Sequence, residues 1–175
     1  GTAKEQLAAT RGILPAIGDG RVYVAMGQPQ QSNRNIFVGG RAQGPTSKIS
    51  LQAFGLESGK LMWVSGRNED KATKEFLESV DLMSAPVYSG GRVYCPAVKR
   101  GSMNEVYMLG FDADTGRLAW KTFVCAAQPL MAGMNYQASQ AVEDCLPAAV
   151  SDDYVALATN AGGLAVMRSG SGELC

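Results

Sequence analysis

Short runs rich in β-branched and aromatic residues recur along the chain and are separated by turns that contain glycine. One set is "RVYVA" (21–25), "RVYCPAV" (92–98) and "YVALAT" (154–159), and a second is "ISLQAF" (49–54), "EVYMLGF" (105–111) and "LAVM" (164–167). "KLMWVS" and "RLAWKTFV" form a third set, and short runs around Pro15, Pro86 and Pro147 form a fourth. Runs of this length and composition are typical of strands. The pattern therefore predicts units of four short antiparallel strands.

The units repeat at a nearly constant spacing. Gly59, Gly116 and Gly172 stand in equivalent turns, 57 and 56 residues apart (116 − 59 and 172 − 116). Four-stranded sheets repeated in tandem are the blades of a β-propeller. We predict an all-β fold in one domain, 1–175: a partial β-propeller of three four-stranded antiparallel blades. The repeats lie at about 13–65, 84–124 and 146–175, the last being incomplete. Three blades do not close a ring, so we expect further blades of a longer chain, or another protein chain, to complete it.

The only two tryptophans, Trp63 and Trp120, each lie four residues after a turn glycine. In "GFDADTGRLAW" (110–120), Asp112 can accept hydrogen bonds from amides of the turn, and Gly116 supplies the positive φ that such a turn needs. A large flat side chain just beyond a fixed turn can cover the joint between one blade and the next. We therefore expect both tryptophans to be packed between blades; stacking on a quinone is the alternative.

These residues resemble the tryptophan-docking repeat of the quinoprotein-type propellers, A-x-D-x-x-x-G-x-x-x-W. The second unit matches at Asp112, Gly116 and Trp120, with Gly110 at the Ala position. The first unit matches at Ala53, Gly59 and Trp63 but has Gly55 in place of Asp, and the third keeps only Gly172. The resemblance covers nearly the whole chain and implies a blade-docking role for Trp63, Trp120, Asp112, Gly59, Gly116 and Gly172. The family includes pyrroloquinoline quinone-dependent dehydrogenases, an outer-membrane protein assembly lipoprotein and extracytoplasmic proteins without a cofactor.

The features that the resemblance would imply for a quinone enzyme do not match this sequence. The chain has no His, and Cys95, Cys125, Cys145 and Cys175 are isolated, so the adjacent Cys-Cys pair is missing. No residues match the family's calcium-binding or catalytic motifs. We therefore expect no catalytic, cofactor-binding or metal-binding residue here, and no pyrroloquinoline quinone or Ca²⁺. A fragment of a quinone-dependent dehydrogenase remains an alternative.

The long connections of the predicted blades gather at one end, which is typical of a binding surface. They span residues 27–48, 66–82, 99–104 and 125–145. "NEDKATKEFLESV" (68–80) predicts a short amphipathic helix capped by Asn68 or Asp70, with Ala72, Phe76 and Val80 four residues apart. "TAKEQLAATRG" (2–12) predicts another helix, and "NYQASQAVED" (135–144) a weaker one. The candidate binding face comprises Arg34, Asn35, Arg67, Asn104, Met131, Met134, Asn135 and Tyr136.

Charge and hydropathy narrow the classes of partner that this chain is expected to bind. Lys plus Arg equals Asp plus Glu at 16 each, which argues against nucleic acid or an anionic membrane surface. No apolar run approaches the roughly 20 residues of a membrane span. The four cysteines are compatible with an oxidising compartment. Cys125 and Cys145 bracket one insertion and form a candidate disulfide, with free thiols as the alternative.

The leading hypothesis is a non-catalytic extracytoplasmic (periplasmic or extracellular) scaffold. It binds a protein, peptide or glycan on the candidate binding face, the face decorated by the long connections. A structural module of a larger envelope or surface protein is a further alternative.

Overall fold

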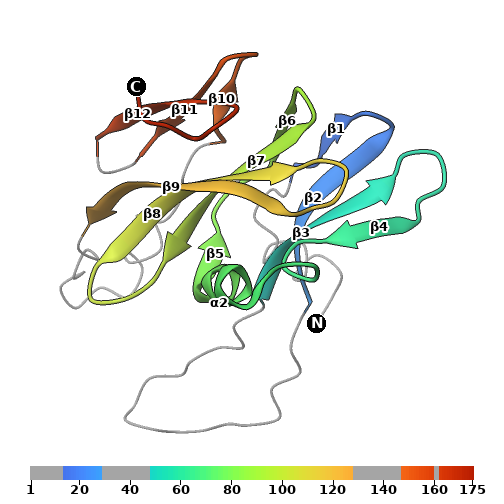
Figure 1. Ribbon diagram of the computed structural model, residues 1–175, viewed down its shortest axis with the longest axis horizontal. Helices are drawn as coiled ribbons and strands as arrows, with labels where there is room; N and C mark the ends of the chain where they lie inside the picture. Colours follow the sequence, from blue (N-terminus) through green and yellow to red (C-terminus); the bar gives the residue numbers. More distant parts are fainter. Residues whose placement is uncertain (1–13, 29–47, 128–146, 160–161) are drawn as a thin grey trace, which may run out of the picture.

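The computed structural model describes residues 14–28, 48–127, 147–159 and 162–175, and its strands form three antiparallel sheets (Figure 1). Blade 1 has the order β1-β2-β3-β4, comprising Ala16–Gly18, Arg21–Gln28, Lys48–Gly55 and Leu61–Val64. Blade 3 has the order β10-β11-β12, comprising Ala149–Val150, Tyr154–Ala158 and Leu164–Arg168. Beyond β12, Leu174 forms a single antiparallel bridge to Met167. The predicted all-β propeller architecture is confirmed.

Blade 2 contains five strands because its innermost strand is divided in two. These strands are β5 (Val80–Leu82), β6 (Val87–Ser89), β7 (Arg92–Lys99), β8 (Asn104–Asp112) and β9 (Leu118–Ala127). β5 and β6 pair with opposite ends of β7, and the residues between them include Pro86. Across this break, the Met83 amide donates to the Pro96 carbonyl at 2.9 Å. Since N–H and C=O of one strand residue point to the same side, the missing N–H of Pro96 faces the break, and the ladder between β7 and β8 loses no bond.

The helix α2 (Lys71–Ser79) connects blade 1 to blade 2. Asp70 is its N-cap and accepts hydrogen bonds from the amides of Ala72 and Thr73 at 2.9 and 3.1 Å. The prediction that Val80 belongs to this helix is wrong. Val80 has extended dihedral angles, pairs with Lys99 and is 4% exposed in β5. The β-branched side chain of Val80 favours an extended backbone and packs into the sheet. As a result, β5 begins at the residue that directly follows α2. The other two predicted helices lie outside the described residues.

Strand alternation gives each blade two apolar faces, and these faces form the contacts between blades. One buried cluster joins blades 1 and 2 and includes Tyr23, Leu51, Trp63, Cys95 and Phe111. A second joins blades 2 and 3 and includes Tyr94, Met108, Trp120, Leu157 and Met167. We call these contacts joint 1–2 and joint 2–3. Cys95 of β7 is fully buried in joint 1–2.

The two ends of the blades differ in their connections. Figure 1 shows the β1–β2, β3–β4 and β8–β9 turns toward one end, whereas α2 and the β7–β8 connection lie toward the other. We call these the turn end and the decorated end. Within the described ranges, no helix is long and apolar enough to cross a membrane.

Candidate functional site

At joint 1–2, Trp63 of β4 lies on the β8–β9 turn of blade 2. It is 7% exposed, and its indole N–H donates to the Ala113 carbonyl at 3.0 Å. A Cβ built on Gly116 would come within 3.0 Å of the Trp63 ring. Gly116 also has φ +72°, a conformation that L side chains rarely adopt. Glycine is therefore required there for two reasons, the turn itself and the indole that lies on it.

Joint 2–3 repeats this arrangement one blade later. Trp120 of β9 is 9% exposed, and its indole N–H donates to the Ser169 carbonyl at 3.0 Å. A Cβ on Gly172 would come within 3.0 Å of the Trp120 ring. Opposite Trp120 in the β8–β9 ladder stands Gly110, whose Cβ would also overlap the indole. A glycine at the motif's alanine position therefore makes room for Trp120.

The acidic turn residue Asp112 stabilises the β8–β9 turn. Its carboxylate accepts from the amide and the hydroxyl of Thr115 at 2.9 and 2.7 Å. These bonds, led by the one from the hydroxyl, lower the pKa of Asp112. Gly55 and Arg168 occupy the equivalent positions in blades 1 and 3, so the turn acid is present in blade 2 alone among the three repeats.

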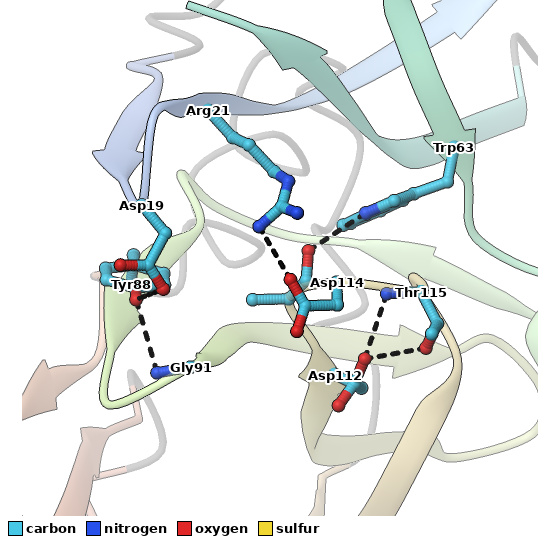
Figure 2. A network of polar contacts seen from close by, with 9 residues as sticks. Asp19, Arg21, Trp63, Tyr88, Gly91, Asp112, Asp114 and Thr115 are labelled. Carbon is cyan, nitrogen blue, oxygen red and sulfur yellow. Dashed lines mark hydrogen bonds and ion pairs between the residues drawn. The ribbon is translucent and has the colours of Figure 1, made fainter.

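A polar network at the turn end joins blade 1 to blade 2 (Figure 2). Arg21 forms an ion pair of 2.8 Å with Asp114, and the Tyr88 hydroxyl donates to Asp19. The Arg21 guanidinium also lies beside the Tyr23 hydroxyl, and this contact raises the pKa of Arg21. Even so, neither the Tyr23 hydroxyl nor Nε of Arg21, both buried, meets a hydrogen-bond partner among the described residues.

Sequence analysis missed the tyrosines of both joints. Tyr23 and Tyr94 occupy the same position of the repeated "RVY", and each ring lies 5.9 Å from its neighbouring indole, centroid to centroid. Burial raises the pKa of both hydroxyls, so both remain protonated donors at neutral pH. The repetition of "RVY" in the first two units was the available signal.

A groove of about 470 Å³ lies between β3 and β4 of blade 1 and α2 and β5 of blade 2. Its apolar lining comprises Ile49, Leu61, Val64, Leu77, Val80, Leu82 and Phe111. Polar lining comes from Ser50, Gln52 and Ser65, and charge from Arg67, Lys74 and Glu78. Arg67 and Lys74 are exposed, and neither has an ion pair within the described ranges. The groove thus combines an apolar floor with two cationic side chains, a composition suited to an apolar segment that carries a carboxylate.

The predicted binding face is described at two positions only. Arg67 lines the groove, whereas Asn104 begins β8, is half-buried and is not part of the lining. Arg34, Asn35, Met131, Met134, Asn135 and Tyr136 lie outside the described residues. Cys125 lies on β9 and is partly buried. Cys145 lies outside the described ranges, so the Cys125–Cys145 disulfide stays a prediction.

The expectation that this chain holds no pyrroloquinoline quinone or Ca²⁺ stays a prediction. Nowhere in the described ranges do three or more His, Cys, Asp or Glu side chains form a group that could hold a metal ion. Both indoles, which would be the stacking surfaces, lie against turn glycines at the joints.

Comparison with known proteins identifies the family to which the chain belongs. The model described as "Outer membrane protein assembly factor BamB" matches residues 2–175. Curated protein sequences give no match. BamB from Moraxella catarrhalis superposes with a TM-score of 0.50 at 14% identity, over 93% of this chain and 35% of that one. Quinohemoprotein alcohol dehydrogenase ADHIIG from Pseudomonas putida HK5 superposes with a TM-score of 0.52 at 15% identity, over 92% of this chain and 25% of that one.

The chain therefore spans about a third or less of the length of these solved structures. At such low identity they show the fold alone, a β-propeller. The match of the family model over nearly the whole sequence carries the assignment: the chain belongs to the BamB-like family of PQQ-type β-propellers.

Proposed function

We propose that this chain acts as a non-catalytic extracytoplasmic propeller scaffold, and that it binds a protein partner through the groove beside α2. The groove is the observation that carries the proposal. It lies at a blade joint next to the one described helix. Three residues of its apolar lining, Val80, Leu82 and Phe111, also belong to the buried cluster of joint 1–2. A site on such a rigid base binds with little loss of conformational freedom.

The chemistry of the groove favours a peptide segment of the partner. Leu77 and Val64 offer apolar contacts on opposite sides, from α2 and β4. Arg67 and Lys74 add positive charge, and the lining carboxylate of Glu78 opposes it in part. An extended segment with an apolar anchor and an acidic neighbour complements these features. The family description, an assembly factor for outer membrane proteins, is consistent with a protein partner outside the cytoplasm.

Selection of phage-displayed peptides on the folded chain tests the proposal. Peptides with an apolar residue next to Asp or Glu are expected to be enriched. The double variant Arg67→Glu, Lys74→Glu is expected to weaken their binding at least tenfold, measured by calorimetry, because it reverses both charges. The double variant Lys60→Glu, Arg117→Glu is the matched control, since it makes the same charge change at exposed positions of the turn end. Equal binding to both double variants would contradict the groove as the site.

A further inference from the structure

Three aromatic rings form a row on the side of blade 2 that belongs to joint 1–2. They are Phe76 of α2, Tyr107 of β8 and Phe123 of β9. The ring centroids of Phe76 and Tyr107 lie 5.2 Å apart, and those of Tyr107 and Phe123 lie 5.7 Å apart, both in edge-to-face geometry. Tyr107 and Phe123 also stand directly opposite each other in the pairing of β8 with β9. We call these three rings the aromatic row.

The aromatic row is separate from the groove. Lys74 and Glu78 of α2 line the groove, whereas Phe76 stands two positions from each of them. Two positions correspond to roughly 200° around a helix, so Phe76 lies on nearly the opposite side of α2. No ring of the row belongs to the groove lining. The helix therefore contributes one side to each of two surfaces.

One end of the aromatic row is accessible. Phe123 is 49% exposed on β9, the outermost strand of blade 2, whereas Tyr107 and Phe76 are half-buried. The strand pairing and the contact with the Tyr107 ring hold Phe123 in place. An exposed ring that is already fixed loses little conformational freedom when a ligand binds to it.

A lysine lies beside the exposed ring. Lys121 precedes Phe123 by two residues, so both side chains point to the same face of β9. The Lys121 ammonium lies 3.9 Å from the centroid of the Phe76 ring, where the negative ring face attracts it. Lys121 is exposed, and its ammonium forms no ion pair with a described residue. The row thus carries a positioned cation that can bind a carboxylate.

A carboxylate lies on the other side of the exposed ring. Glu105 is two residues before Tyr107 on β8, so Glu105 and Lys121 flank the pair of Tyr107 and Phe123 from opposite sides. Oε2 of Glu105 accepts from the Tyr107 hydroxyl at 2.7 Å and lies 3.9 Å from the Lys99 ammonium. Both contacts use the same oxygen, which leaves Oε1 as an acceptor for a further hydroxyl. The Phe123 ring is therefore flanked by a donor and an acceptor.

We propose that the aromatic row binds an oligosaccharide that contains an acidic sugar (a uronate). The C–H face of a sugar ring stacks on the electron-rich face of Phe123, because its C–H bonds carry partial positive charge. Hydroxyls at the rim of the sugar donate to Glu105, and its carboxylate accepts from Lys121. The two ammonium groups of Lys99 and Lys121 exceed the single carboxylate of Glu105, so the charge beside the row complements an anionic sugar.

A protein partner fits this surface less well. Side chains that anchor protein interfaces bind in pockets that surround and desolvate them. The Phe123 ring instead stands on an outermost strand between charged side chains, so a partner would have to bury Lys121 and Glu105 with it. Sugar hydroxyls satisfy such groups directly. The inference does not depend on the groove or on the peptide proposed to bind there.

Titration with uronate oligosaccharides tests the proposal. The probes are tetrasaccharides of hyaluronan, alginate and polygalacturonate, with chitotetraose and maltotetraose as neutral counterparts. Binding to the full chain is followed by ligand-observed NMR. At least one uronate probe is expected to bind saturably and about tenfold more tightly than either neutral one. Lys121→Gln keeps a donor but removes the charge, so it is expected to abolish that preference.

Substitutions of Phe123 separate stacking from general hydrophobicity. Phe123→Leu is expected to weaken uronate binding about tenfold. Phe123→Trp should retain binding, because an aromatic face remains. Tyr154→Leu is the matched control, since Tyr154 is 46% exposed on β11 of blade 3, and it should bind as the parent chain does. Thermal denaturation of each variant checks that the fold is intact.

The proposal is overturned if no uronate probe binds saturably at millimolar concentration, or if Phe123→Leu binds as well as the parent chain. Loss of binding in Tyr154→Leu would also contradict it. Phage-selected peptides distinguish this site from the groove. Peptides whose binding falls with Phe123→Leu but not with the double variant Arg67→Glu, Lys74→Glu would show that the aromatic row binds protein, and the oligosaccharide proposal would then be wrong.

Discussion

Joint 1–2 and joint 2–3 hold their indoles in the same way but support the neighbouring tyrosines differently. The planes of the tyrosine and the indole are inclined by 37° in the first and 42° in the second. In joint 2–3, the Tyr94 hydroxyl donates to the Ser169 carbonyl at 3.3 Å, the carbonyl that Trp120 also uses. In joint 1–2, Tyr23 stacks on Tyr88 at 5.5 Å and 4°, and its hydroxyl has no described partner. The indole geometry is thus a property of the repeat, whereas the polar contacts belong to each joint.

Removal of either indole is expected to give the largest effect. Trp63→Ala and Trp120→Ala should each lower the free energy of unfolding by about 3–5 kcal/mol, because each leaves a large cavity between blades. Phe123→Ala is the control on β9, since its ring is 49% exposed and should cost far less. Urea denaturation followed by circular dichroism measures the difference. Similar losses for Trp120→Ala and Phe123→Ala would contradict docking at joint 2–3.

The turn glycines sharpen the comparison by separating backbone strain from contact with the indole. Gly116→Ala and Gly59→Ala place an alanine at nearly the same positive φ, +72° and +62°. Both should lose about 1–2 kcal/mol from that strain. Gly116→Ala should lose roughly 1–3 kcal/mol more, because its Cβ overlaps the Trp63 ring. Equal Tm values for the two variants would contradict this account, because they would mean that the Trp63 ring moves away from the new Cβ without loss of stability.

The tyrosine hydroxyls are expected to give opposite results in the two joints. Tyr94→Phe should cost about 1 kcal/mol, since it removes a hydrogen bond within a buried cluster. Tyr23→Phe should be neutral or stabilising, because it removes a buried hydroxyl that has no described hydrogen-bond partner. Chemical denaturation curves of both variants give their free energies of unfolding. A larger loss of stability for Tyr23→Phe than for Tyr94→Phe would contradict our account of the two joints.

The turn of blade 2 should respond to acid where the other two turns do not. Hydrogen bonds from Thr115 lower the pKa of Asp112 in the folded chain, so its contribution to stability is complete above the unfolded value near 4. That contribution is lost as the pH falls through the lowered folded pKa. Asp112→Asn should therefore flatten the decline in stability below about pH 4, an effect on the order of 0.5 kcal/mol after solvent screening. Glu57→Gln on the exposed β3–β4 turn is the control.

Local sequence predicted the parts of the fold that depend on local geometry. Asp112, Gly116 and Trp120 lie within one turn and the strand after it, so their spacing encodes the turn and the side chain beyond it. The acceptors of the indoles were not predictable. Ala113 and Ser169 accept through backbone carbonyls, which every residue has. The residue type at these positions therefore does not indicate the acceptor.

The groove and the strand β5 could be recognised only in the tertiary structure. Groove residues come from β3, β4, the connection between β4 and α2, and from α2, β5 and β8, and no local pattern links them. For Val80, the four-residue spacing of Ala72, Phe76 and Val80 indicated a helix, but pairing with Lys99 in the sheet prevailed. Arg67 was found because a cationic residue in a long connection is a general sign of a surface site. Lys74 was missed because it looks like an ordinary solvated helix residue.

The break between β5 and β6 has a consequence for how blade 2 opens. β5 is bonded only to the last three residues of β7, and β6 only to the first three, so the inner edge of the blade consists of two separate short ladders. α2 continues directly into β5, so the helix and this short strand can detach as one unit while β6 remains paired. In native-state hydrogen exchange, the amides of α2 and β5 should therefore exchange together at a lower free energy than those of the β7–β8 ladder. A ligand bound in the groove would slow exchange in that unit first, because the unit forms one wall of its site.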